Sequence, residues 1–121
     1  MRVHRPGYNS WSAIQSELSW AKALRSDTGV VTPRAIAGKN GDLSQSALLD
    51  ESKDERFMVA FAFEEGIEPS ESDELTPHFV ELGRLAAIAH NHTQSWKLPD
   101  GFERLKWDAK AILDPNGLRG D

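Results

Sequence analysis

The sequence predicts an α+β fold, in which a small antiparallel sheet carries one packed helix and is followed by a helical segment. The first observation is an amphipathic stretch from about Trp11 to Ser26 that is set between capping residues. The second is the run 56–63, which is nearly all apolar and predicts a central strand covered on both faces. The third is a set of apolar positions at helical spacing after Thr76, which predicts a second helix.

The composition limits the class of protein. The chain has 121 residues, which suits one domain or a large part of one. It contains no cysteine, so a disulfide framework, a thiolate metal site and a cysteine nucleophile are excluded. Hydrophobic residues make up 39% and charged residues 27%, as in soluble globular proteins, and no apolar run is long enough for a membrane span or a secretory signal. We therefore expect a cytoplasmic protein without a membrane partner.

The net charge of −5 argues against a nucleic-acid partner, because nucleic-acid binding usually rests on a basic face. The charges are unevenly distributed along the chain. The stretch 50–74 is mainly acidic and is interpreted as a solvated face, whereas residues 1–41 are mainly basic. This basic part of the chain is compatible with a small anionic ligand. Its cationic side chains are Arg2, Arg5, Lys22, Arg25, Arg34 and Lys39.

Short local signals place the N-terminal elements. Residues 1–5 predict a strand, which Pro6-Gly7 ends. In the first helix, Ser12 and Gln15 are spaced as a capping box, and Gly29 stands where a glycine after the last helical turn is expected.

The following segment predicts two more strands. Residues 30–37 are extended but interrupted by Pro33, which favours an edge or bulged strand. The pair Asn40-Gly41 favours a two-residue hairpin turn, with residues 43–49 as the returning strand.

The C-terminal half is expected to be helical after an acidic loop over 64–74. Thr76 is the expected cap of the second helix, with Pro77 at its first position and an end near Asn91. The tail is predicted to form a loop and one short helix around 104–113. His90 and His92 lie two residues apart near the end of the second helix and face different directions. They therefore do not predict a metal site.

Glu17 does not fit its surroundings in the first helix. At about 100° per residue, it lies in the middle of an apolar arc. The arc consists of Trp20, Ala13, Leu24, Ala21, Ile14 and Leu18. Such a carboxylate either lies at the rim and reaches solvent or points inward to hold a cation, because burying an unpaired charge is costly. Arg2 is the favoured cation, ahead of Arg34 and Arg56.

Several short motifs occur in an order and spacing that are specific only when taken together. They are Arg2–Tyr8, Ser16–Trp20, Thr32–Arg34, Asn40–Asp42, Phe61–Gly66, Leu82–His90 and Phe102–Arg104. In this order the chain resembles the N-terminal lobe of the aminoglycoside-phosphotransferase family, the kinase-like small-molecule phosphotransferases that include homoserine kinases. The resemblance covers almost the whole chain and implies a partial protein-kinase-like fold.

The resemblance implies a role for five residues. Arg2 matches the basic residue, more often lysine, that contacts the α and β phosphates of the nucleotide, and Glu17 matches the helix glutamate that orients it. Phe61 would lie behind the adenine. Ala62 and Glu64 would offer backbone carbonyl and amide groups to the adenine edge.

The resemblance also implies a division of the chain and a set of ligands. Residues 1–66 match part of the nucleotide-binding lobe, and residues 67–121 match the start of the helical lobe. ATP, Mg²⁺ and a small-molecule hydroxyl as phosphoryl acceptor are implied for the complete family protein. The catalytic His-Gly-Asp motif and the later metal-binding aspartate are absent from the sequence. We therefore expect a fragment of a kinase with no catalytic residues or metal ligands of its own and negligible activity alone.

Two other interpretations remain open. The chain is either a non-catalytic remnant that binds a nucleotide or a protein, or an unrelated small α+β interaction domain. We also expect self-association, because the strand over residues 1–5 would present an open sheet edge.

Overall fold

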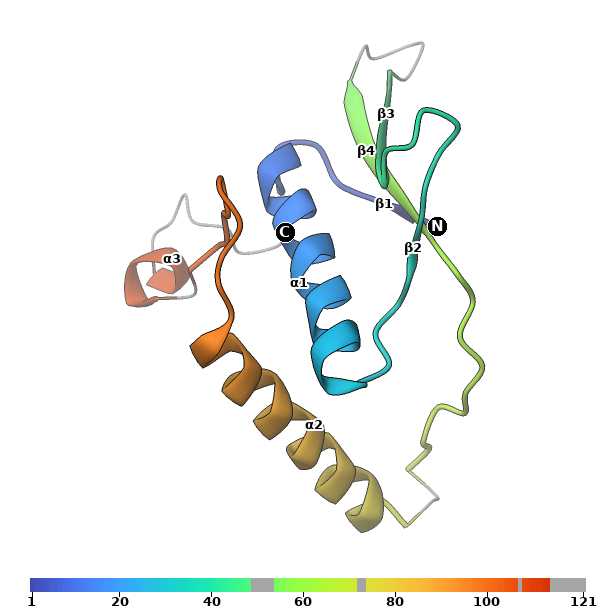
Figure 1. Cartoon of the computed structure of the whole chain (residues 1–121), viewed down its shortest axis with the longest axis vertical. Helices are drawn as coiled ribbons and strands as arrows, with labels where there is room; N and C mark the ends of the chain where they lie inside the picture. The colour runs from blue at the N-terminus through green and yellow to red at the C-terminus, as the bar shows by residue number, and fades with distance from the viewer. Residues whose placement is uncertain (49–53, 72–73, 107, 114–121) are drawn as a thin grey trace.

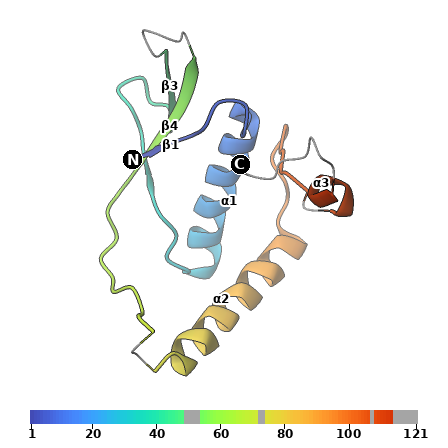
Figure 2. The ribbon, with the colours of Figure 1, turned by 180° about the vertical axis from the view of Figure 1, so that it is seen from behind.

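The computed structural model describes residues 1–48, 54–71, 74–106 and 108–113. Its elements confirm the α+β prediction: a four-stranded antiparallel sheet, a helix packed on it and a second long helix (Figures 1 and 2). In chain order they are β1 (Arg2–Val3), α1 (Trp11–Thr28), β2 (Ala35–Ile36), β3 (Ser44–Leu48), β4 (Glu55–Phe61), α2 (Thr76–Ser95) and α3 (Ala109–Leu113).

The strand β4 is the centre of the sheet, as predicted. β1 pairs with one of its edges, with Arg2 opposite Val59. β2 and β3 share the other edge, where Ile36 lies opposite Ala60 and Ser44 opposite Val59. Because both strands run antiparallel to β4 in adjacent registers, they form one edge strand that is interrupted by a loop over 37–43.

The predicted hairpin at Asn40-Gly41 is therefore wrong, although the turn itself is present. The amide of Gly41 donates to the carbonyl of Gly38 over 2.9 Å, and Gly38 in turn donates to Asp42 over 2.9 Å. Gly41 has a φ of +85°, a conformation that glycine adopts without steric cost. The turn closes a loop on one edge of β4 and does not reverse the direction of the strand.

The N-cap of helix α1 (Trp11–Thr28) lies two residues before Ser12, the first residue of the predicted capping box. Ser10 is the N-cap, and its Oγ accepts the amide of Ala13 over 3.0 Å. The predicted capping box at Ser12 is wrong, because Gln15 reaches across to donate to Ser44 in β3. The helix ends as expected at Gly29, which has a φ of 74° and donates its amide to the carbonyl of Arg25.

The core between α1 and the sheet is small. It is built on Ile14, Leu18 and Val59, and partly buried apolar side chains surround it. These neighbours are Ala35, Leu43, Phe57 and Phe61. Val59 is the one buried residue of β4. The prediction that this strand is covered on both faces is therefore wrong: α1 covers one face, and Val3 on the other face of the sheet is 52% exposed.

The helix α2 lies across the end of α1, away from the sheet (Figure 1). It begins at Thr76 with Leu75 as its N-cap and no side-chain cap, so the predicted Thr76 cap is wrong, whereas Pro77 does lie in the first turn. His92 on α2 contacts Asp27 on α1 through Nε2 and Oδ2, 2.8 Å apart. The segment after α2 returns to the start of α1, where the Glu103 amide donates to Ser16 Oγ.

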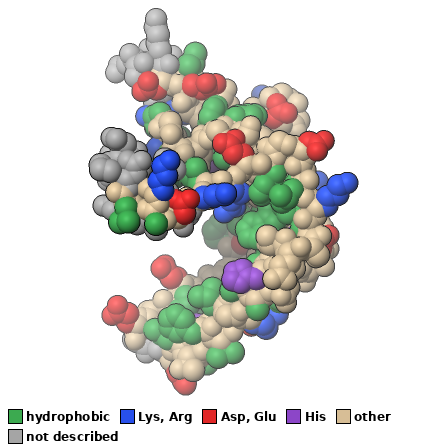
Figure 3. Space-filling view, turned by 90° about the vertical axis from the view of Figure 1, so that its left-hand side faces the viewer, with side chains coloured by type: hydrophobic (Ala, Val, Ile, Leu, Met, Phe, Trp, Pro, Cys, Tyr) green, Lys and Arg blue, Asp and Glu red, His purple; other side chains and the backbone are tan. Residues whose placement is uncertain are grey.

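The outer side of α2 is apolar and exposed to solvent. Phe79 is 64% and Val80 69% exposed, and no residue of this helix is buried. Figure 3 shows apolar side chains along α2 in the lower part of the view. In the described part of the chain, no helix combines the length and the hydropathy that crossing a membrane requires.

Candidate functional site

An ion pair joins the first strand to the first helix. Arg2 Nη1 lies 3.0 Å from Glu17 Oε1. The register explains this geometry: Arg2 lies opposite Val59, and Val59 packs under Ile14, which precedes Glu17 by one helical turn on the same face. The predicted pairing of Glu17 with Arg2, ahead of Arg34 and Arg56, is confirmed.

The pair is half-exposed and lies at the rim of the core. The side chains of Arg2 and Glu17 are 42% and 40% exposed. Both sequence interpretations of Glu17 therefore describe part of its position, since it reaches the rim and also holds a cation. At this exposure the pair contributes at most about 1 kcal/mol to folding.

Two further donors of the Arg2 guanidinium are buried beside this ion pair. Its Nε and Nη2 atoms are buried, yet within the described ranges neither makes a hydrogen bond. Its Cζ lies 5.2 Å from the centre of the Phe61 ring, in a cation–π contact. A buried donor without an acceptor costs about 1–3 kcal/mol. A guanidinium presents its donors as a planar fork that matches phosphate or carboxylate oxygens.

His4 is a neighbour of this pair that the sequence argument did not select. It is buried on the same side of β1 as Arg2, and its backbone amide donates to the Phe57 carbonyl over 2.8 Å. Burial, followed by the positive charge of Arg2, lowers the pKa of His4, while Glu17 raises it by a smaller amount. Alternate residues of a strand share a face, so the predicted strand over residues 1–5 already places His4 on the same side as Arg2.

The segment after β4 is held to the sheet by one backbone hydrogen bond of Ala62. The Ala62 amide donates to the Arg34 carbonyl over 2.8 Å, which holds this segment against β2. In the part of the chain that the structure describes, the Ala62 carbonyl and the Glu64 amide make no backbone hydrogen bond. The Glu64 carboxylate is 3.3 Å from Arg25 Nη1. Among the described residues, the two groups that the resemblance assigns to the adenine edge are therefore not used in backbone pairing.

Glu17 also borders a cavity of about 380 Å³ between the start of α1 and the returning tail. Arg104 lies at this cavity and stacks over Trp20, with its Cζ 5.7 Å from the ring centre. The indole Nε1 of Trp20 is buried without a hydrogen-bond partner among the described residues. The sequence argument used Arg104 only as part of a motif and did not place it near Glu17.

The two histidines near the end of α2 differ in their surroundings. His92 is 2.8 Å from Asp27 and stacks on Trp96 with ring centres 5.9 Å apart. His90 is exposed at a separate apolar cavity that Trp96 also lines. No group of three His, Asp or Glu side chains in the described ranges is arranged to hold a metal ion.

Comparison with known proteins gives one informative match. No family model matches the chain, and no curated protein does. Among solved structures, the chain is similar to a microcompartment-associated aminopropanol kinase, with 37% sequence identity and a TM-score of 0.76. The match covers 90% of this chain and 33% of that kinase. The chain therefore has a kinase-like fold and spans about a third of the length of the kinase it matches.

Proposed function

We propose that this chain is the nucleotide-binding part of an ATP-dependent phosphotransferase of the aminoglycoside-phosphotransferase type, which acts on a small-molecule hydroxyl in the cytoplasm. The observation that carries the proposal is the Arg2–Glu17 ion pair, in which two buried donors of Arg2 are left for an anionic ligand. The sequence and fold similarity to a kinase supports the same class of activity.

Each site residue has one task in this proposal. Arg2 binds the α and β phosphates through its unpartnered donors, and Glu17 holds the guanidinium in place from α1. Phe61 lies behind the adenine ring. The Ala62 carbonyl and the Glu64 amide form hydrogen bonds with the adenine edge. The ion pair thus fixes the phosphates relative to the segment after β4.

Among the described residues, no three His, Asp or Glu side chains cluster in a way that could hold a metal ion. No step of this proposal therefore involves a metal ion held by this chain. The sequence also lacks the His-Gly-Asp motif of the family, which supplies the base that orients the acceptor hydroxyl. We propose that the chain binds nucleotide but does not transfer phosphate alone.

The acceptor class follows from the similar kinase, which is named for an amino alcohol. We take small amino alcohols as the first acceptors to test for the complete enzyme. Such a substrate carries a hydroxyl that accepts the γ-phosphoryl group and an ammonium group that distinguishes it from neutral alcohols.

The decisive experiment is a calorimetric titration of the full 121-residue chain with ATP and ADP. We expect saturable binding that Glu17→Ala weakens about tenfold, because Arg2 then loses the group that orients it. Glu81→Ala is the matched control, since Glu81 also forms a helix-surface ion pair, with Arg84, but lies on α2. An assay of the same sample with MgATP and 1-amino-2-propanol should yield no product.

Two results would contradict the proposal. One is a wild-type chain that stays folded by circular dichroism but binds neither nucleotide. The other is nucleotide binding that Glu17→Ala and Glu81→Ala affect equally. Ordinary turnover by the isolated chain would refute the claim that it is inactive alone.

A further inference from the structure

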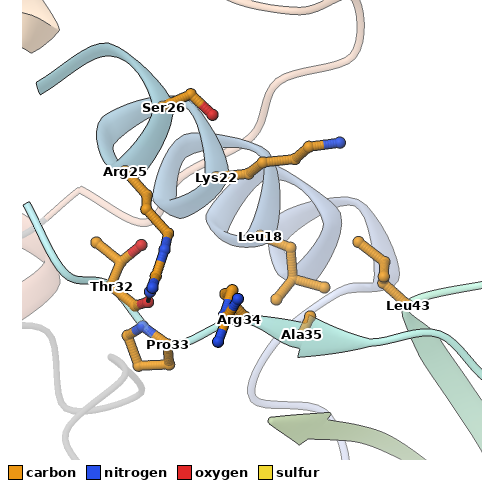
Figure 4. Close-up of a pocket in the computed structure, with 9 residues that line it drawn as sticks. All are labelled: Leu18, Lys22, Arg25, Ser26, Thr32, Pro33, Arg34, Ala35 and Leu43. Carbon is orange, nitrogen blue, oxygen red and sulfur yellow. Dashed lines mark hydrogen bonds between the residues drawn. The ribbon is translucent and has the colours of Figure 1, made fainter. Parts of the chain in front are cut away.

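A second cavity lies on a different side of α1, between that helix and β2. It measures about 330 Å³ and combines cationic and apolar walls (Figure 4). Its cations are Lys22 and Arg25 from α1 and Arg34 from the segment that leads into β2, and its apolar floor includes Leu18, Ala35 and Leu43. Ligand pockets for small molecules begin at about 300 Å³ and pair an apolar lining with a few polar groups.

The positive charge of this basic cavity is only partly neutralised. Arg25 contacts Glu64 at 3.3 Å and donates to the Thr32 carbonyl, so its charge is shared. Lys22 and Arg34 form no ion pair with any residue that the structure describes. In Figure 4 the Arg25 side chain extends from α1 towards Arg34, whereas Lys22 extends along α1 with its ammonium group pointing away from Arg34. Arg34 is thus free to bind an anionic group at the cavity, and the exposed Lys22 side chain is free to turn towards it.

The basic cavity is separate from the candidate nucleotide site. At about 100° per residue, Leu18, Lys22 and Arg25 lie about 80–140° around the helix from Glu17. Neither Arg2 nor Glu17 lines the cavity. The two regions are nevertheless linked through the backbone, because the Arg34 carbonyl accepts the Ala62 amide and Arg25 contacts the Glu64 carboxylate.

We propose that the basic cavity binds a small organic anion, with one phosphate or carboxylate group on an apolar body. The anionic group binds the Arg34 guanidinium, the Lys22 side chain turns towards it from α1, and the apolar body contacts Leu18, Ala35 and Leu43. An anion large enough to reach Arg25 competes with Glu64 for its guanidinium. This ligand site goes beyond the proposed nucleotide function and does not depend on it.

The test uses phenyl phosphate as the probe in a ¹H–¹⁵N NMR titration of the full chain at low salt. Inorganic phosphate supplies the charge without the ring, and phenol supplies the ring without the charge. We expect the amide signals of Lys22, Arg34 and Ala35 to follow one saturable curve with phenyl phosphate. Inorganic phosphate should bind more weakly and phenol should give little shift.

The variants Lys22→Gln and Arg34→Gln remove one free cation each at exposed positions. Each is expected to weaken phenyl phosphate binding about three- to tenfold at the cavity, since a charge-assisted contact is lost. The control is Lys97→Gln, which makes the same charge change at an exposed site outside the cavity. Raising the ionic strength to about 0.5 M should weaken binding as well.

The outcomes separate this site from the nucleotide site. The proposal is overturned if the cavity signals do not move, or if Lys97→Gln weakens binding as much as Arg34→Gln. It is also overturned if phenyl phosphate shifts only the signals of Arg2, Glu17 and Phe61. If Glu17→Ala loses ATP binding but keeps an unchanged phenyl phosphate titration curve at the cavity, both sites are supported. If the wild-type chain binds phenyl phosphate at the cavity but does not bind ATP, only the proposed function is refuted.

Discussion

Arg2 is the residue on which the candidate nucleotide site depends. Its guanidinium combines an ion pair with Glu17, a cation–π contact with Phe61 and two donors without partners. The aminoglycoside-phosphotransferase family, which the sequence resembles, more often has lysine at the matching position. Lysine keeps the charge but offers a compact ammonium group instead of a planar fork.

Substitution of Arg2 tests whether charge or fork geometry matters more. We expect Arg2→Lys to retain ATP binding within about threefold of the wild type, because the charge and the pairing with Glu17 survive. Arg2→Gln should weaken binding about tenfold or more, since the charge-assisted contacts are lost. Calorimetric dissociation constants measure both effects. Equal affinities for Arg2→Gln and the wild type would show that the phosphates bind elsewhere.

His4 makes the stability of the fold depend on pH. Its folded pKa is lowered chiefly by burial, so the folded state favours the neutral ring. In the unfolded chain the histidine ring binds a proton near its ordinary pKa of 6.5. The stability that the neutral ring provides is therefore complete above this pH and falls as the pH drops towards the folded pKa. Urea unfolding should show a larger loss of stability from pH 7.5 to 5.5 in the wild type than in His4→Gln. An equal loss in both proteins would exclude His4 as the cause.

The residues of the site differ in how far the sequence could predict them. Glu17 was predictable because a lone carboxylate in an apolar helical arc needs a cation, and few basic residues were available nearby. His4 and Arg104 were not selected. His4 required knowledge of which strand face is covered, and Arg104 reaches Trp20 and the cavity beside Glu17 only because the tail returns to α1.

At the scale of elements, the start of α1 gives a direct test of local energetics. Ser10 Oγ accepts the Ala13 amide at 3.0 Å and also donates to Glu103 at 3.0 Å, whereas the Ser12 side chain is exposed on the first turn. We expect Ser10→Ala to reduce the free energy of unfolding by about 1 kcal/mol. Ser12→Ala is the matched control and should change it by less than about 0.5 kcal/mol. Urea denaturation of both variants measures these two losses of stability. A larger loss for Ser12→Ala than for Ser10→Ala would show that Ser12 caps the helix, as the predicted capping box requires.

Elements with long patterns were predicted well, whereas the short signals gave mixed results: the strand over residues 1–5 and the role of Gly29 were confirmed, but the caps at Ser12 and Thr76 and the hairpin were wrong. The apolar run of β4 and the helical period of α1 predicted both elements correctly, because the burial of a whole face determines whether such a segment forms a strand or a helix. The turn at Asn40-Gly41 was recognised, but its local conformation does not determine whether the chain reverses or continues. Here β2 and β3 continue along one edge of β4, since that edge offers partners over its whole length. Tertiary pairing, which the local sequence does not contain, made this choice.

At the scale of the whole molecule, much apolar surface remains uncovered. Ile14, Leu18 and Val59 form a small core, while Phe79 and Val80 on α2 are exposed to solvent. Large exposed apolar patches are typical of surfaces that bind another chain. The edge of β1 that faces away from β4 has no strand partner among the described residues, so its backbone groups are also available.

These two surfaces predict concentration-dependent self-association, and variants can tell them apart. Val3→Lys places a charge on β1, a device by which natural sheet edges avoid pairing, whereas Phe79→Ser removes apolar surface from α2. If the strand edge mediates association, Val3→Lys should raise the concentration at which light scattering detects dimers by about tenfold and Phe79→Ser should leave it unchanged. The opposite pattern would assign association to α2, because only the loss of its apolar surface would then matter. A wild-type chain that stays monomeric at millimolar concentration would show that neither surface associates, despite its exposure.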